Sequence, residues 1–295
     1  MSPTFDETQL RFDRTRRLVG AAALERLRES CVLVAGCGGV GGATAVLLAR
    51  MGVGRFILAD PGRFDPPDVN RQWAADETAM GENKAGQYAK ILKLIDPETE
   101  VDAVPEGVTW TNLEGLVEPA SAVVDGLDYS VGLDLRSALF ARSRARGAYC
   151  VSTPAIGFGT LVAASSPDGE PMDSFVSLLA LVDSRGLPPA MGRFFAAPTL
   201  AAMNRELPRG KVPSIAVGPA LCGAYAATEV FLALAATGEP GWRAPLCLPR
   251  VLVLDALGAT HQVVDIEELH AAMGGPASPG SPAPDSPPAG PGGAA

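Results

Sequence analysis

A glycine-rich loop between an apolar strand and a helix constrains the fold of this 295-residue chain more than any other feature. Residues 32–35 (VLVA) predict a buried strand, and the loop at 36–42 (GCGGVGG) turns the chain. Residues 43–51 predict a helix that ends at Gly52, and residues 56–60 predict the next strand. The segment is therefore expected to form a β-α-β unit of about 30 residues.

The loop satisfies the G-x-G-x-x-G pattern at Gly36, Gly38 and Gly41, and Gly39 lies inside it. Because it follows a strand and opens a helix, its backbone N–H groups can face a phosphate. Asp60 ends the next strand, where a carboxylate can accept hydrogen bonds from ribose hydroxyls. We expect these residues to bind an adenine nucleotide, and they fit an NAD-dependent oxidoreductase equally well.

Two cations downstream of the loop help to distinguish an enzyme that cleaves the nucleotide from an NAD-dependent oxidoreductase. Arg71 lies in the segment Asn70-Arg71-Gln72, and Lys84 follows it. Hydride transfer gains little from extra cations, whereas displacement at an α-phosphate builds negative charge that Arg71 and Lys84 can neutralise. Taken singly, each also fits a solvated surface cation. Together with the loop they favour cleavage of the nucleotide.

The rest of the chain alternates between strand and helix patterns, which is typical of a doubly wound, Rossmann-like α/β fold. We therefore predict a mostly parallel sheet with helices on both faces. Further strands are predicted at residues 101–104, 122–124, 148–152, 159–165, 250–254 and 261–266, and helices at 84–94, 136–146 and 220–236. Residues 183–213 have weak periodicity and predict a mobile crossover loop.

Three segments are predicted. Residues 1–30 form an N-terminal helical segment with one or two amphipathic helices between 11 and 30, and residues 31–273 form the Rossmann-like domain. Residues 274–295 contain only Gly, Pro, Ala, Ser and one Asp, so we expect a disordered tail.

Composition limits the partners and the cellular location that can be expected for the chain. The net charge of −9 argues against a surface that follows nucleic-acid phosphates. The charged N-terminus does not resemble a signal peptide, and no apolar run reaches the roughly 18 residues of a membrane span. The five scattered cysteines argue for reduced thiols rather than disulfides. We therefore expect a cytoplasmic protein without a membrane or nucleic-acid partner.

These residues resemble one known family, the ubiquitin-activating-enzyme-like adenylyltransferases, which include the molybdopterin-synthase and thiamine-biosynthesis enzymes. The resemblance covers roughly residues 10–260, and several dispersed motifs in the right order carry it. These motifs are Arg11-Phe12-Asp13-Arg14, the loop Gly36 to Gly41, Asp60, Arg71-Gln72, Lys84, Asp128, Pro213-Ser214-Ile215 and Thr228-Glu229.

The resemblance implies that the site binds ATP and Mg²⁺ while a C-terminal carboxylate attacks the α-phosphate. It implies that Arg71 and Lys84 hold phosphates, that Gln72 lies at the nucleotide and that Asp128 holds Mg²⁺. A carboxylate at the end of a strand suits this hard cation. It further implies a homodimer in which Arg14 reaches into the partner's site.

The chain also departs from the family. Asp68 stands where the family usually has Asn, and we expect it to bind metal or ribose instead. Arg136 comes eight residues after Asp128 rather than about five, so the local helix start must differ. Met172 and Phe175 stand where a zinc-binding C-x-x-C pair is expected, so we expect no zinc.

No cysteine occurs between Cys150 and Cys222, so an enzyme-bound thioester is not expected. The leading hypothesis is an adenylyltransferase that activates the C-terminal carboxylate of a small protein or peptide, such as a sulfur carrier, a ubiquitin-like protein or a peptide precursor. The acceptor, sulfide or an amine, stays open. The alternatives are a non-catalytic scaffold subunit of such an enzyme and an NAD-dependent oxidoreductase.

Overall fold

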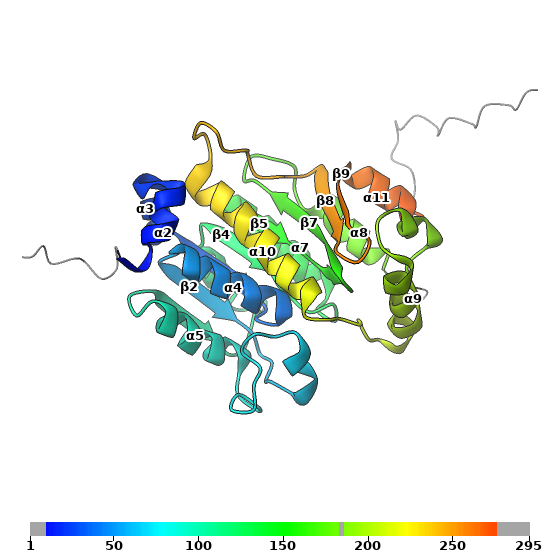
Figure 1. The fold of residues 1–295 in the computed structure, drawn as a ribbon, viewed down its shortest axis with the longest axis horizontal. Helices are drawn as coiled ribbons and strands as arrows, with labels where there is room; N and C mark the ends of the chain where they lie inside the picture. Colours follow the sequence, from blue (N-terminus) through cyan, green and yellow to red (C-terminus); the bar gives the residue numbers. More distant parts are fainter. Residues whose placement is uncertain (1–9, 183–185, 276–295) are drawn as a thin grey trace, which may run out of the picture.

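The computed structural model describes residues 10–182 and 186–275, which form one mixed sheet with helices on both faces (Figure 1). The strands are β1 (Cys31–Ala35), β2 (Arg55–Ala59), β3 (Glu100–Val104), β4 (Ala122–Asp125), β5 (Tyr149–Ser152), β6 (Ala155–Ile156), β7 (Gly159–Ser165), β8 (Arg250–Asp255) and β9 (Thr260–Asp265). The architecture confirms the predicted α/β fold class.

The α-helices are α2 (Asp13–Val19), α3 (Ala21–Glu29), α4 (Gly39–Met51), α5 (Lys84–Ile95), α6 (Leu113–Val117), α7 (Leu133–Ala145), α8 (Asp173–Ala180), α9 (Ala197–Glu206), α10 (Val217–Phe231) and α11 (Ile266–Ala272). Short 3-10 helices are η1 (Pro66–Asn70), η2 (Pro189–Arg193) and η3 (Leu207–Arg209), and a π-helical turn, η4 (Leu232–Ala236), extends α10.

The first half of the sheet is parallel, in the order β3-β2-β1-β4-β5. β1 pairs with β2 on one side and with β4 on the other, so Ala35 lies beside both Ala59 and Asp125. Every residue of β1 and β4 is buried, as expected for parallel strands covered on both faces. The predicted β-α-β unit is confirmed, and it brings three strand ends to one edge of the sheet.

The second half of the sheet runs antiparallel, through β5-β7-β8-β9 with β6 beside β7. The sequence predicts a mostly parallel sheet, and the structure is parallel only as far as β5. The chain turns directly from β6 into β7 at Gly157, whose φ is +59°. Such a tight turn joins antiparallel strands only, because a parallel connection needs a long crossover.

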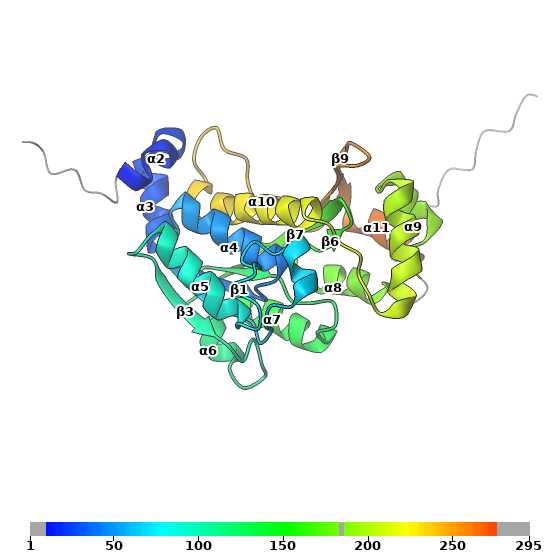
Figure 2. The same cartoon turned by 60° about the horizontal axis from the view of Figure 1, so that its bottom comes forward.

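Alternate residues of β1 face two separate hydrophobic cores, since side chains in a strand point to opposite faces. Leu33 packs with α6, α7 and α8 on one face. Val32 and Val34 pack with α3, α4, α5 and α10 on the other. Figure 2 shows the resulting three layers, with α4 and α10 on one side of the sheet and α6, α7 and α8 on the other.

The segment predicted as a mobile crossover loop is largely helical, because it contains η2 and α9. Its apolar side chains fill the core on the α7 face, namely Met191, Phe194, Phe195, Met203 and Leu207. These residues do not repeat with one helical period, which is why the sequence pattern missed them. Helices α8 and α11 were also missed. Residues 183–185 of the predicted loop lie outside the described residues.

Helix Val217–Ala236 is long and apolar enough to cross a membrane by length and composition alone, although Thr228 and Glu229 interrupt its apolar run. It packs against α4 so closely that a Cβ on Gly223 would lie 2.7 Å from the Ala43 Cβ. In its middle, the fully buried Glu229 carboxylate forms an ion pair with Arg243 and accepts the Leu246 N–H at 2.8 Å. These contacts make it a core helix of this fold.

The N-terminal helices α2 and α3 join the domain through Asp96, at the end of α5. Its side chain is fully buried and forms ion pairs with Arg11 and Arg28. The proposed division at residues 30 and 273 stays a prediction, and residues 1–9 and 276–295 of the outer segments lie outside the described residues.

Asp96→Asn is expected to lower the free energy of unfolding by about 1–3 kcal/mol at pH 7, because two guanidinium groups lose their anion. Burial raises the pKa of Asp96, but the hydrogen bonds and charges of Arg28 and Arg11 outweigh it, so the net pKa lies below its ordinary value. The stabilisation is therefore present above the ordinary pKa and lost as pH falls through the lowered one.

Urea denaturation at pH 7 and pH 3 checks this prediction. Glu98→Gln is the matched control, because Glu98 pairs with Arg28 at 3.1 Å but is exposed, and it should cost less than about 1 kcal/mol. Equal losses in the two variants, or an Asp96→Asn loss that does not shrink in acid, would contradict the anchoring role.

Candidate active site

The predicted site residues gather where β1, β2 and β4 end. Gly36 N–H donates to the Ala59 carbonyl at 2.8 Å, and Gly126 N–H donates to the Ala35 carbonyl at 2.8 Å. The loops after the three strands are therefore held side by side, at the edge where ligands bind in open α/β sheets.

The glycines of the loop have different tasks. Gly36 has a φ of +89°, and a Cβ there would lie 2.2 Å from the Gly126 carbonyl oxygen. A Cβ on Gly41 would lie 1.8 Å from the Gly36 carbonyl oxygen, whereas a Cβ on Gly38 would meet nothing within 4 Å. Gly36 and Gly41 thus permit close backbone packing, and Gly38 borders open space.

Helix α4 begins at Gly39, four residues earlier than predicted, so the loop itself forms its first turn. Its N-cap residue Gly38 makes no side-chain capping bond. A helix N-terminus without a side-chain cap leaves N–H groups available to an anion. The expectation that Gly38, Gly39 and Gly41 present amides to a phosphate is compatible with this geometry.

Asp60 fastens the glycine loop to the exit of β2. Its Oδ2 accepts the Cys37 N–H at 2.6 Å, and its Oδ1 accepts the Gly62 N–H at 2.6 Å. Burial raises the pKa of the Cys37 thiol well above its ordinary value. Cys37 is fully buried and is therefore a packing residue.

Asp68 lies at the centre of a polar cluster formed by η1 and the start of α5. Its Oδ2 lies 3.0 Å from Lys84 Nζ, and its Oδ1 lies 3.4 Å from Arg71 Nη2 and also accepts from Gln72 Nε2. The sequence predicts that Asp68 binds metal or ribose. In the structure its carboxylate joins the two predicted phosphate-binding cations, and the contact with metal or ribose stays a prediction.

Asn83, which the sequence analysis missed, sets the position of Lys84. As the N-cap of α5, its Oδ1 accepts the Gly86 N–H at 3.0 Å. Its Nδ2 donates to the carbonyls of Asp60 at 2.9 Å and Gly62 at 3.2 Å. The helix start is thereby tied to the loop after β2. An Asn directly before a predicted helix is a capping signal that could have identified it.

Asp128 is exposed on the loop after β4. Its Oδ1 accepts the Ser130 N–H at 2.9 Å and the Ser130 hydroxyl at 2.6 Å, and its Oδ2 has no partner among the described residues. Burial raises the pKa of Asp128, but the Ser130 hydrogen bonds, with the charges of Lys84 and Arg136, hold the net pKa below its ordinary value. The side chain therefore stays anionic with one oxygen open.

Arg136 holds the loop after β4, which carries Asp128, in place. It is buried, lies 3.2 Å from Asp125 Oδ2, and donates to the carbonyls of Leu127 at 2.9 Å and Asp128 at 3.2 Å. Ser152 also donates to Asp125, at 2.7 Å. Helix α7 begins at Leu133, so the changed spacing places Arg136 in its first turn. Asp125 was missed because the predicted strand stopped one residue short of it, and Ser152 was missed because, at the end of its predicted strand, it was assigned no role.

Arg14 is not brought to these residues. It is exposed on α2, and it has no ion-pair partner among the described residues, whereas Arg16 and Arg17 pair with Asp13. A Cβ on Gly52, at the end of α4, would lie 2.6 Å from a Leu24 methyl and 3.6 Å from the Phe12 ring. The N-terminal helices thus lie at the end of α4 opposite Gly38, about 20 Å away.

The site fits Mg²⁺ only if the ion is coordinated jointly by the protein and by the phosphates of the nucleotide. The described residues contain no group of three or more His, Cys, Asp or Glu side chains that could hold a metal. Mg²⁺ is commonly held by one or two carboxylates together with substrate phosphates. The open oxygen of Asp128 suits that arrangement. Met172 and Phe175, at the expected zinc-ligand positions, are buried in the apolar core.

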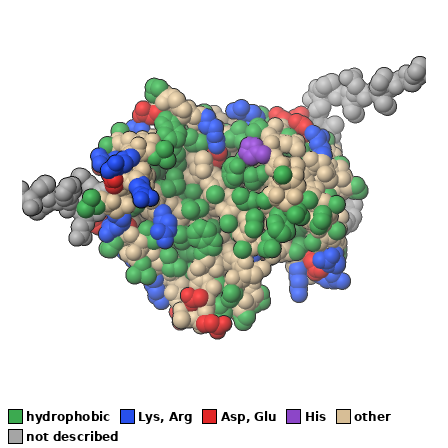
Figure 3. Space-filling model, viewed as in Figure 1, with side chains coloured by type: hydrophobic (Ala, Val, Ile, Leu, Met, Phe, Trp, Pro, Cys, Tyr) green, Lys and Arg blue, Asp and Glu red, His purple; other side chains and the backbone are tan. Residues whose placement is uncertain are grey.

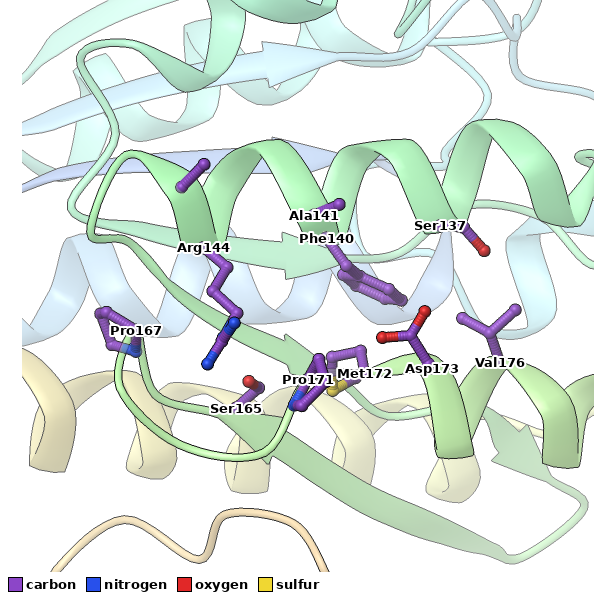
Figure 4. A pocket seen from close by; sticks show the side chains of 11 residues that line it. Ser137, Phe140, Ala141, Arg144, Ser165, Pro167, Pro171, Met172, Asp173 and Val176 are labelled. Carbon is purple, nitrogen blue, oxygen red and sulfur yellow. The ribbon is translucent and has the colours of Figure 1, made fainter.

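A separate cavity of about 360 Å³ lies between α7, α8 and the loop before α8 (Figure 4). Arg144, Asp173 and Met172 are among its lining residues, and Arg144 donates to the Gly169 carbonyl at 2.7 Å. None of the predicted site residues lines it, so it is distinct from the site at the strand ends.

Comparison with known proteins agrees with this arrangement. The ThiF family profile matches residues 12–272, and the chain therefore belongs to the ThiF family. This membership confirms the resemblance that the dispersed motifs predict.

Relatives with similar sequences align over part of the chain. The vegetative HesA protein of Trichormus variabilis is 36% identical over 123 residues, which cover 40% of this chain and 46% of HesA. The tRNA threonylcarbamoyladenosine dehydratase of Bacillus subtilis is 37% identical over 120 residues (41% and 45% of the two chains). The sulfur carrier protein adenylyltransferase of Thermus thermophilus is 33% identical over 110 residues (37% and 41%). The match therefore spans less than half of each relative.

Solved structures share the fold over a longer range. A crystal structure of PaaA superposes with a TM-score of 0.68 at 15% identity, covering 90% of this chain and 86% of PaaA. Escherichia coli MccB, crystallised with MccA-N7isoAsn, superposes with a TM-score of 0.65 at 16% identity and coverages of 90% and 73%.

Gly41→Ala is expected to lower the free energy of unfolding by about 1–3 kcal/mol, because its methyl group would overlap the Gly36 carbonyl. Gly38→Ala is the matched control from the same loop, and it should cost no more than about 1 kcal/mol, the preference for Gly over Ala at an N-cap. Urea denaturation measures both. Equal destabilisation of the two variants would contradict the separate tasks of these glycines.

Proposed function

We propose that this protein is an ATP- and Mg²⁺-dependent adenylyltransferase that activates the C-terminal carboxylate of a small protein or peptide. The observation that carries the proposal is the convergence, at one edge of the sheet, of an uncapped helix N-terminus, two cations and an open carboxylate. These are the groups that a nucleotide triphosphate requires.

In this proposal the amides of Gly38, Gly39 and Gly41 receive the nucleotide, while Gly36, whose N–H is bound to Ala59, shapes the turn beside it, with Asp60 at the ribose and Gln72 nearby. Arg71 and Lys84 hold the phosphates where negative charge develops. Asp128 holds Mg²⁺, which neutralises phosphate charge when bound. Arg136 keeps the Asp128 loop in place through two backbone carbonyls.

The reaction needs no general base, because a C-terminal carboxylate is already ionised at neutral pH. A carboxylate oxygen forms a bond to the α-phosphorus while the bond to the leaving pyrophosphate breaks. The products are an acyl-adenylate and pyrophosphate. Without a cysteine between Cys150 and Cys222, the acyl group passes to an external nucleophile rather than to an enzyme thiol.

Several relatives support this substrate class. One is a sulfur carrier protein adenylyltransferase, and the structural neighbour MccB was crystallised with MccA. Another relative is a tRNA dehydratase. The net charge of −9 disfavours tRNA here, because nucleic-acid binding depends on cations that neutralise phosphates. All five cysteines are free thiols, which agrees with a cytoplasmic location.

We further propose a homodimer in which Arg14 completes the partner's site. Arg14 lies on α2, which packs at the end of α4 opposite its own glycine loop, and α4 is about 20 Å long. Leu18, one helical turn after Arg14 on the same side of α2, is 78% exposed, and Leu10, which precedes α2, is 55% exposed. Apolar side chains also gather on the face of α4 and α10 (Figure 3), where Val217 is exposed. Both features suit contact with a second copy.

ATP–pyrophosphate exchange with a panel of peptides ending in Gly-Gly or other C-termini tests the activity. Lys84→Ala and Asp128→Ala should each lower exchange by about 10²-fold or more. Lys90→Ala, an exposed lysine on the same helix, should leave it unchanged. Undiminished exchange in the first two variants would contradict their roles. Nucleotide binding without exchange would favour a non-catalytic scaffold subunit. Reduction of a nicotinamide cofactor would favour an NAD-dependent oxidoreductase.

Mixing two inactive variants tests the role of Arg14. Arg14→Ala and Lys84→Ala should each be inactive alone. After subunit exchange at equal concentrations, half of the dimers are mixed and each has one complete site, so about a quarter of wild-type exchange should return. A mixture that stays inactive while forming mixed dimers would show that Arg14 does not act across the interface.

A further inference from the structure

The carboxylate of Asp68 binds donors from three residues proposed to contact the nucleotide. It contacts Lys84 Nζ at 3.0 Å, Arg71 Nη2 at 3.4 Å and Gln72 Nε2, and it accepts the Asp65 N–H at 3.2 Å. The side chain of Asp68 is only 10% exposed, against 15% for Lys84 and 29% for Arg71. The acid therefore lies beneath the two cations rather than in front of them.

Each cation uses only some of its N–H donors in contacts within the chain. Arg71 Nη1 donates to the Pro67 carbonyl and to Asn70 Oδ1, both at 3.0 Å, while Nη2 contacts Asp68. No described residue accepts from Arg71 Nε. Lys84 has three N–H donors, and Asp68 is its ion-pair partner. Donors thus remain on both side chains for a ligand on their exposed side.

The charge of Asp68 also changes what the cluster offers to an anion. Lys84 and Arg71 carry two positive charges, and Asp68 reduces the local sum to one. The asparagine usual in the family would leave both charges uncompensated. It would also supply one acceptor oxygen in place of two, with an amide group that donates. The substitution of Asn by Asp is therefore a change in both geometry and charge.

We propose that Asp68 is a positioning residue that fixes Arg71 and Lys84 from beneath and, through its negative charge, weakens the binding of nucleotide phosphates. This rests on the proposed function, because the ligand is MgATP. The carboxylate keeps both cations in place before the nucleotide arrives, so little reorganisation is needed at the transition state. The same charge opposes the phosphates and eases the departure of pyrophosphate.

Two substitutions separate the two effects. Asp68→Asn removes the charge but keeps an acceptor oxygen, so it should bind the nucleotide more tightly and retain most of kcat. Asp68→Ala removes the charge and every acceptor, so Arg71 and Lys84 lose their common anchor. Asp65→Asn is the matched control, because Asp65 is an exposed carboxylate in the same turn and Asn also caps a helix.

The experiment measures the Kd of a non-hydrolysable ATP analogue with Mg²⁺ by titration calorimetry, and kcat by ATP–pyrophosphate exchange. Asp68→Asn should lower Kd about fivefold or more, with a steeper dependence of Kd on salt, because one unit of opposing charge is gone. Asp68→Ala should have a kcat about tenfold or more below that of Asp68→Asn. Asp65→Asn should match the wild type in both.

A Kd for Asp68→Asn that equals or exceeds the wild-type value overturns the charge effect. Equal kcat values for Asp68→Asn and Asp68→Ala overturn the positioning effect. Thermal unfolding identifies a variant that does not fold, and Asp68→Ser, which keeps one acceptor without charge, then takes the place of Asp68→Asn. Nucleotide binding without exchange contradicts the adenylyltransferase proposal but leaves the Kd comparison decisive for Asp68. A wild type that binds no nucleotide overturns both.

Discussion

The site depends on the contact between Gly36 and Gly126, where the backbone leaving β1 touches the backbone leaving β4. The Gly36 carbonyl oxygen would lie 2.6 Å from a Cβ on Gly126, so neither residue can carry a side chain without a shift. This contact, with the bond from Gly36 N–H to Ala59, holds three loops together. The start of α4, the Asp60 turn and the Asp128 loop are all placed by it.

Four acidic residues surround this edge, and three of them serve as anchors. Asp60 binds two backbone amides, Asp68 joins two cations, and Asp125 holds Arg136 and Ser152. Asp128 alone among these four keeps an oxygen without a partner in the described chain. The contrast separates carboxylates that shape the site from the one that is available to a metal ion.

The local features of the site were predictable from sequence because each has a short-range signature. The β-α-β unit, the glycine loop and the helix beginning at Lys84 follow from residue patterns within about 30 positions. The support beneath them was not predictable, because side-chain contacts between separate elements have no sequence pattern of their own. Arg136 reaches back to Asp125 and two carbonyls, and Asp68 meets Lys84 across sixteen positions of loop. The sequence motif identifies Arg71 and Lys84, but only the fold shows that Asp68 lies between them.

The antiparallel direction of the strands after β5, which were themselves predicted, and helix α9 were missed for a similar reason. Their apolar residues pack against a face already built by α7 and the strands, so tertiary contacts rather than a regular period decide their structure. Met203 and Leu207 are buried in that core although the segment around them is rich in Gly and Pro. Resemblance to a family predicted more of the function than hydrophobic periodicity did, because it combined motifs that are far apart in sequence.

The central claim, that a carboxylate oxygen attacks the α-phosphorus, is tested most directly by isotope transfer. A peptide substrate labelled with ¹⁸O in its C-terminal carboxylate is incubated with the enzyme, MgATP and hydroxylamine as acceptor, and the nucleotide products are analysed by mass spectrometry. The account predicts one ¹⁸O atom in the AMP and none in the pyrophosphate. Formation of ADP, or AMP that carries no label, would contradict it.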